Sequence, residues 1–276
     1  MKKLPLFIAF IASVCVLVPL AHAQGKAVGN IKILEVKGGS ASVTMPDGSS
    51  TPATAGEFIQ QGATVKTGSG SSVSLLFDNG ALIVVEPKSE LSVDEFTTDP
   101  FNYEGIDYKT LPKEPSKSAT KLMVKDGLVA VDVVSLNSKS KFEIATPVGT
   151  AGVRGTRFGV SFNSATNRAN VVVVIGAVSV SSSQGQMQIV SAGMGIGLGA
   201  AGIQALAQQV ISAIAQQISQ IIQALRPTVP SNPFAGAPPQ TSTGDGGDQT
   251  DDTGDQGTID AGQTLPNSGS PASVPR

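Results

Sequence analysis

Short runs of apolar residues separated by turn residues fill the chain from residue 30 to residue 192. Ser71 to Phe77 alternates, so that one face of an extended strand carries Val73, Leu75 and Phe77. Asp78-Asn79-Gly80 follows, and Asn-Gly is the strongest hairpin signal because both residues tolerate a positive φ. Runs this short, with no helical period between them, predict an all-β domain over residues 24–192, built as a sandwich, barrel or solenoid.

One long segment, residues 97–120, interrupts this pattern and contains three prolines and both tyrosines of the protein. A loop of this length inside a compact domain is usually functional or disordered. Its aromatic residues Phe101, Tyr103 and Tyr108 suggest either a partner-binding surface or a cover over the open end of the β core. We favour the cover, because exposed aromatic clusters are uncommon on soluble monomers.

A different pattern begins after the β domain. Closely spaced glycines predict a flexible hinge over residues 193–202. Residues 203–226 then read as an uncharged amphipathic helix that ends before Pro227. Its apolar residues are spaced like the a and d positions of a heptad: Ala207, Ile211, Ile214, Ile218, Ile221 and Leu225.

Three interpretations of this helix remain open. The favoured one is that its wide apolar stripe covers an edge or end of the β domain. The second is a homo-oligomer through a short coiled coil of residues 203–225, which the missing charges at e and g weaken. The third, a helix lying on a membrane, is disfavoured because the polar face has no Lys or Arg to meet anionic lipid. Seven glutamines and two serines argue against a transmembrane span.

Pro, Gly, Ser, Thr, Asp and Gln dominate residues 227–276, so we expect a disordered acidic tail. The aspartates between Thr243 and Gly257 faintly suggest calcium ligands. The strict EF-hand spacing is absent, and a solvated linker is favoured over a calcium site.

The N-terminus has the three parts of a secretory signal. Lys2 and Lys3 precede an apolar run from Leu4 to Leu20, and Ala21-His22-Ala23 supplies a small-x-small cleavage site. We expect residues 1–23 to be a signal peptide that is cleaved after Ala23. The mature protein would then be periplasmic, secreted or on the cell surface.

Export would remove the one cysteine, Cys15, and the one histidine, His22. Without thiol or imidazole, neither a Cys/His zinc site nor a Ser-His-Asp or Cys-His catalytic centre can form. The remaining carboxylates read as strand-edge charges and turn caps. We therefore expect no enzyme, no cofactor and no metal. The 19 basic and 21 acidic residues form no basic stripe, so nucleic acid is not an expected partner.

Several elements, in one order along the chain, resemble the FecR domain. They are a Gly-x-x-Val-x-Thr-Gly turn, an acidic-x-Gly hairpin, a Pro-x-Ser and the corner around Thr146: Gly62, Val65, Thr67, Gly68, Asp78, Gly80, Pro87, Ser89, Thr146, Pro147, Val153, Arg154, Gly155 and Thr156. The family is known from periplasmic parts of iron-uptake signalling regulators and from many exported bacterial proteins. The resemblance implies an all-β, solenoid-like or sandwich-like fold, a binding or signalling role and no catalytic residues.

The chain departs from the regulator type, which carries a cytoplasmic anti-sigma segment and a membrane helix before the domain. Here a signal peptide is expected instead, so direct signalling to a sigma factor is not. We expect a non-catalytic, exported scaffold or regulatory module of the cell envelope that binds a protein or a glycan. The alternative is a structural or adhesin-like surface protein that self-assembles through the β domain and the C-terminal helix.

The glycine-rich stretch from Ala145 to Val160 could in principle cradle a phosphate, which requires a helix after the turn. Residues 156–162 alternate as a strand instead, so a β corner is predicted. We expect Arg154 to be structural, with its guanidinium bound to backbone carbonyls or to a carboxylate.

Overall fold

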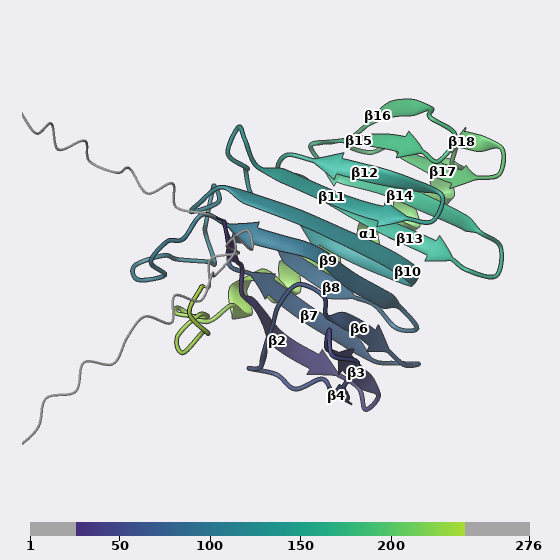
Figure 1. Ribbon diagram of the computed structural model, residues 1–276. Helices are drawn as coiled ribbons and strands as arrows, with labels where there is room; N and C mark the ends of the chain where they lie inside the picture. Colours follow the sequence, from purple (N-terminus) through teal and green to yellow (C-terminus); the bar gives the residue numbers. More distant parts are fainter. Residues whose placement is uncertain (1–25, 241–276) are drawn as a thin grey trace, which may run out of the picture. The chain divides into compact units, whose positions relative to one another are not determined.

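The computed structural model describes residues 26–240. The predicted signal peptide, and the aspartates between Thr243 and Gly257 for which a linker was favoured over a calcium site, lie outside this range. Within it the chain forms two open β-sheets packed face to face, with one helix against the second sheet (Figure 1).

Sheet A runs from the N-terminal to the C-terminal end of the domain. Its strands, in spatial order, are β4 (Ser50–Pro52), β3 (Ala41–Thr44), β6 (Thr64–Thr67), β9 (Glu90–Thr98), β10 (Ser118–Asp132), β11 (Lys141–Thr146), β12 (Gly149–Val153), β15 (Ala177–Ser182) and β16 (Met187–Ser191), with β1 (Ala27–Val28) also on β9.

Sheet B runs in the same direction. Its strands, in spatial order, are β5 (Phe58–Ile59), β2 (Ile31–Lys37), β7 (Ser72–Phe77), β8 (Leu82–Val85), the second half of β10, β13 (Arg157–Asn163), β14 (Arg168–Ile175), β17 (Gly195–Gly199) and β18 (Gly202–Ala205).

Strand β10 belongs to both sheets. Its first part pairs with β9 and β11 in sheet A, and residues 127–132 pair with β8 and β13 in sheet B. The strand bends at a bulge before Asp126 and at Gly127, which has a φ of 83°. A side chain at Gly127 would also collide with Ser89, so glycine is required twice over at this bend.

The sheets settle the choice between the predicted β architectures. The fold is all-β with one C-terminal helix, as predicted. Among the strand ladders of residues 26–240, β10–β11 alone is parallel. A β-solenoid stacks its coils through parallel strands, so the antiparallel ladders describe a sandwich.

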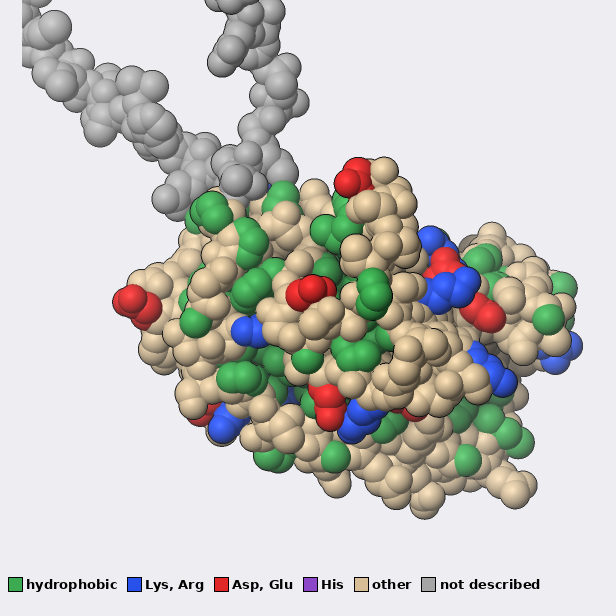
Figure 2. Space-filling view, turned by 90° about the horizontal axis from the view of Figure 1, so that it is seen from below, with side chains coloured by type: hydrophobic (Ala, Val, Ile, Leu, Met, Phe, Trp, Pro, Cys, Tyr) green, Lys and Arg blue, Asp and Glu red, His purple; other side chains and the backbone are tan. Residues whose placement is uncertain are grey.

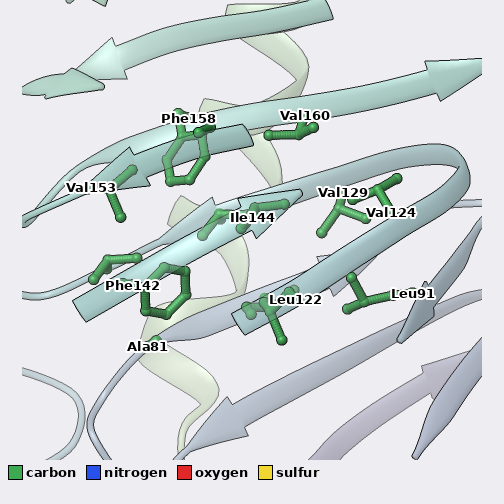
Figure 3. Close-up of a cluster of buried hydrophobic side chains, with 14 of the residues drawn as sticks. Ala81, Leu91, Leu122, Val124, Val129, Phe142, Ile144, Val153, Phe158 and Val160 are labelled. Carbon is green, nitrogen blue, oxygen red and sulfur yellow. The ribbon is translucent and has the colours of Figure 1, made fainter. Parts of the chain in front are cut away.

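The main core fills the space between the two sheets (Figure 3). Alternate residues of each strand point inward, as the period of two predicts. Sheet A contributes Leu91, Leu122 and Ile144, and sheet B contributes Val129, Phe158 and Val160. All six side chains are fully buried.

A second core lies on the outer face of sheet B. Strands β7 and β8 are buried on both faces, which explains their nearly continuous apolar sequences. Helix α1 (Gln208–Leu225) crosses β10, β13 and β14 on this face (Figure 1). Its buried side chains are Ile211, Ile218, Ile222 and Leu225.

The position of α1 bears on the predicted oligomer. Two residues of the heptad seam, Ile218 and Leu225, are buried in the domain's own second core, and Ile214 and Ile221 pack partly against it. A third, Ile211, is buried beside Gly195 of β17. The seam is therefore occupied inside the molecule and is not free for a coiled coil through residues 203–225. The helix within residues 26–240 is not long and apolar enough to cross a membrane.

The predicted glycine hinge over residues 193–202 is wrong, because this segment forms β17 and the turn into β18. The glycines serve close packing. A side chain at Gly195 would press against Ile211 of α1 and Val172 of β14, while Gly202 turns the hairpin with a φ of 80°. The helix accordingly begins at Gln208, later than predicted.

The predicted disorder of residues 227–276 needs correction for its first part. A 3₁₀ turn (Arg226–Thr228) follows the helix, and Val229 and Phe234 are buried in the second core. Burial of these two apolar side chains offsets the ordering entropy that the surrounding Pro, Ser and Gly residues would otherwise leave uncompensated. Residues 241–276 lie outside the described range.

Replacing Ile218 by alanine tests how far the domain depends on α1. Ile218 is fully buried, and its Cδ1 occupies the space that a side chain at Gly159 would need. We expect Ile218→Ala to lower the free energy of unfolding by about 2–5 kcal/mol, measured by urea denaturation. Val210→Ala, at an exposed position of the same helix, should change it by about 0.5 kcal/mol or less. Equal effects of the two variants would mean that α1 is not docked.

Candidate functional site

A shallow groove crosses the outer face of sheet A at its C-terminal end. Strand pairing places Glu143, Gly152, Ser179 and Ile189 side by side across β11, β12, β15 and β16. Gly152 and Ser179 form a low floor, since neither carries a large side chain. The groove has a volume of about 420 Å³.

The walls of the groove differ in chemistry. On one side stand the charged side chains of Lys141, Glu143 and Arg154. On the other side Ile189 is 70% exposed and belongs to the outermost strand. A surface with mixed charges at one wall and an aliphatic side chain at the other suits a peptide segment.

Arg154 stands at the corner that precedes β13. Its guanidinium donates hydrogen bonds to the carbonyl oxygens of Asn137 (3.4 Å) and Ser138 (2.5 Å). The adjacent Gly155 has a φ of 108°, and Thr156 exchanges backbone hydrogen bonds with Val133. The segment therefore passes from strand to strand, and no helix follows it to hold a phosphate.

The other family-motif residues do not converge on one place. Thr67 is buried and donates through its hydroxyl to the carbonyl oxygen of Glu86 (2.6 Å). Thr146 donates to the carbonyl oxygen of Gly149 (3.0 Å). The glycines occupy turns or close approaches: Gly62 and Gly80 have positive φ, and Gly68 packs against Ser40. Pro147 lies in the turn between β11 and β12. These contacts hold turns and neighbouring strands in place, so the motif residues are structural.

Asp78 is the exception, because it is a fully buried carboxyl group at the β7–β8 turn. Its Oδ2 accepts hydrogen bonds from the backbone N–H of Asn30 (2.8 Å), the hydroxyl of Tyr103 (3.0 Å) and Nε2 of Gln240 (3.2 Å). Its Oδ1 has no hydrogen-bond partner among the described residues. Asp78 therefore joins the first strands, the long loop and the C-terminal segment.

All three donors to Asp78 are uncharged, so nothing compensates fully for the loss of water around the carboxylate. Burial raises the pKa of Asp78 from 3.8 to about 7, against the lowering effect of the hydrogen bonds from Asn30, Tyr103 and Gln240. Burial and the nearby Asp78 also raise the pKa of Tyr103 and of Tyr108, so both phenols are neutral donors.

The aromatic residues proposed as a partner surface pack inward instead. Tyr108 is fully buried and donates to the carbonyl oxygen of Asp78 (3.1 Å). Tyr103 stacks on Phe234, with ring centroids 5.2 Å apart, and Phe101 meets Tyr103 edge-on. Phe234 contacts the rings of Tyr103 and Tyr108, which agrees with the favoured interpretation of the loop as a cover, while Phe101 and Tyr103 remain half-buried.

Two further polar centres tie elements together. The buried carboxylate of Glu114 accepts hydrogen bonds from the hydroxyls of Ser118 and Ser140, which anchors the long loop. Asp132 binds two guanidinium groups, Arg157 of β13 (3.2 Å) and Arg226 at the end of α1 (2.6 Å). The described residues contain no cluster of three or more His, Cys, Asp or Glu side chains placed to hold a metal ion.

Charge is mixed over the surface. On the face shown in Figure 2, Lys and Arg side chains lie beside Asp and Glu, among uncharged and apolar side chains. This face offers no patch of one sign.

Sequence reasoning missed the groove. Its floor consists of small residues with no motif of their own, and register alone brings them together. The available signal was the apolar pair Met187 and Ile189, at alternate positions of a strand whose other face buries Val190.

The raised pKa of Asp78 predicts how stability depends on pH. The folded state keeps a proton that the unfolded state releases, so this contribution is complete below pH 3.8 and is lost as the pH rises through about 7. We expect the free energy of unfolding of the wild type to fall over that range relative to Asp78→Asn, which cannot titrate. Urea denaturation at a series of pH values measures this. Asp107→Asn, at an exposed site whose pKa is lowered, should retain the wild-type fall. A constant difference between wild type and Asp78→Asn would contradict the prediction.

Two solved structures resemble this chain at low sequence identity. Two crystal structures of a candidate anti-sigma factor from Parabacteroides distasonis resemble the chain with 14% and 15% sequence identity and TM-scores of 0.41 and 0.40. Each match covers 59% of this chain and 72% of that chain. A likeness this distant adds nothing about function. No curated protein matches the chain.

A family model described as FecR protein matches residues 63–179. The matched segment includes β7 to β14, the shared strand β10 and the corner at Arg154, and it ends in β15 at the groove. The chain therefore contains a FecR domain at residues 63–179.

Proposed function

We propose that the protein is a non-catalytic regulatory or scaffold module of the cell envelope, which binds a protein partner in the groove of sheet A. The groove carries this proposal, because it is an accessible hollow within the FecR domain and its immediate border. The FecR family match supports a regulatory role.

The lining of the groove favours a protein over a glycan. Sugar rings are commonly held against exposed aromatic faces, and the aromatic residue beside this groove, Phe142, is 1% exposed. Charged and aliphatic side chains on opposite walls, with backbone exposed at Gly152, instead match the alternating polar and apolar character of a peptide.

The arrangement of polar groups supports a role without catalysis. The ionisable side chains of the groove are Lys141, Glu143 and Arg154, and none of them is paired with a hydroxyl nucleophile. The Ser140 hydroxyl, which is bonded to the Glu114 carboxylate, is buried beneath the lining. The buried carboxyl groups of Asp78 and Glu114 are absent from its lining, and hydrogen bonds commit them to holding the loop and the C-terminal segment.

Filling the groove tests the proposed binding. A side chain added at Gly152 would have its nearest neighbour, the carbonyl oxygen of Ser179, at 3.8 Å, so Gly152→Leu should fold normally. With a photo-crosslinking residue at Ser179, we expect the protein in intact cells to form an adduct with another protein species, and Gly152→Leu to reduce that adduct at least tenfold. Gly39→Leu, at a glycine with open space around it, should leave the adduct unchanged.

The outcome is read by mass spectrometry of the adduct. A crosslinker at exposed Ser164, in the β13–β14 turn, should give no such product. The proposal fails if Ser179 and Ser164 give the same products, or if Gly152→Leu has no effect while its circular dichroism spectrum stays native.

Envelope localisation is part of the proposal and rests on the sequence of residues 1–23. The charged, apolar and small-x-small segments are those of a cleaved secretory signal. We expect the protein recovered from the producing bacterium to begin at Gln24, outside the cytoplasm. N-terminal sequencing of fractionated cells measures this, and Ala23→Lys, which spoils the cleavage site, should retain residues 1–23. An intact Met1 on the wild-type protein in the cytosol would refute export.

A further inference from the structure

The C-terminal edge of sheet A carries no paired strand within residues 26–240. Strand β16 pairs with β15 on one side, and none of the strand ladders of residues 26–240 uses its other side. The N–H of Ser182 donates to the carbonyl oxygen of Gln186, and the N–H of Ala192 donates to the carbonyl oxygen of Gly176. These two bonds show which opposed residues of the β15–β16 hairpin are hydrogen-bonded to each other. Since such pairs alternate, the N–H and C=O groups of Met187 and Ile189 point away from β15.

Exposed apolar side chains gather at this edge. Of the five large hydrophobic side chains exposed among residues 26–240, four lie on β16 or directly beside it: Met187 (75% exposed), Ile189 (70%), Met194 (57%) and Ile175 (52%). Met194 lies beside β16 because its backbone N–H donates to the carbonyl oxygen of Ser191. Ile175 lies there because the next residue, Gly176, accepts a hydrogen bond from the N–H of Ala192. Such a concentration marks an interaction surface.

The other outer strands are short or blocked. β5 has two residues, and β4 has three and ends in Pro52, which cannot donate a hydrogen bond. At β18, the outward N–H of Ile203 already donates to Oε1 of Gln186 (2.7 Å). β16 has five residues and contains neither proline nor a charge.

The chemistry of the edge favours a second copy of the same chain. Residues 169–225 contain no charged side chain, so two copies of this end can approach without like-charge repulsion. An antiparallel pair centred on Ile189 satisfies the outward N–H and C=O of Ile189 in both copies at once. It also sets Met187 against the small Ser191 of the other copy, which leaves room for the longer side chain.

We propose that the protein forms a twofold symmetric dimer in which β16 pairs antiparallel with β16 of a second copy, joining the two A sheets into one. Ile189 lies opposite the partner's Ile189 at the centre of the interface. The dimer places two grooves next to each other on one continuous face. It does not depend on the groove having a partner of its own.

Sedimentation velocity over a concentration series of the purified protein tests the dimer. We expect a reversible monomer–dimer equilibrium, since pairing through one short strand and four apolar side chains makes a small interface. Ile189→Lys and Ile189→Glu should each weaken dimerisation at least tenfold, because each sets two like charges opposite one another. An equimolar mixture of the two variants should dimerise again, since the opposed residues then attract.

Two further variants separate pairing from packing. Ile189→Pro removes an N–H that β15 does not use, so the fold should persist while the dimer is lost. Val210→Lys, the same kind of change at an exposed apolar residue of α1, should leave the dimer unchanged. Circular dichroism checks that each variant is folded. The proline variant removes a backbone hydrogen-bond donor, whereas the charged variants change the side chain, so one folded variant of either kind is enough to test the dimer.

A wild-type protein that stays monomeric at every concentration overturns the proposal. So does a dimer that persists in folded Ile189→Lys or Ile189→Pro, or a mixture of the Lys and Glu variants that fails to associate. These outcomes are independent of the adduct formed at Ser179 with another protein species, so the dimer and the proposed binding function can fail separately.

Discussion

Burial of sheet B on both faces is the constraint on which the rest of the structure depends. Leu76, Leu82 and Val84 point away from sheet A and would lie in water if nothing covered them. Each fully buried aliphatic side chain contributes about 1.5–3 kcal/mol, so an uncovered face would cost much of the stability of a small domain. Helix α1, the long loop and residues 229–234 all serve as this cover.

The cover is held by polar contacts at its borders. Asp78 binds the loop through Tyr103 and the C-terminal segment through Gln240, while Asp132 fixes the end of α1 through Arg226. Asp132 forms ion pairs with two guanidinium groups, whereas the Asp78 carboxyl is buried among uncharged donors. The cover is therefore fastened by ion pairs at one border and by hydrogen bonds from uncharged groups at the other.

Local pattern was enough to predict the all-β class, the hairpin at Asn79-Gly80 and a helix that packs on the β domain, because alternation and heptad spacing report which face is buried. The helix covers the outer face of sheet B, whereas an edge or end of the domain was the predicted position. It failed at residues 193–202, where alternating glycines signal flexibility but form a strand against Ile211. It failed again at residues 229–234, where one phenylalanine in a polar segment completes the aromatic cluster. Asp78 was recognised as a hairpin residue, but its partners lie 48, 25 and 162 positions away, beyond any local signal.

The contact between Gln240 and Asp78 also means that the fold can be completed only after the end of the described segment has been synthesised. Both sheets follow the order of the chain closely, so their strands can assemble as each hairpin is completed. Most of the cover comes from residues 208–240, which the ribosome synthesises after every strand. Until that last segment arrives, much of the outer face of sheet B stays open to water and to other chains, and we expect this nascent form to have the greatest need of a chaperone.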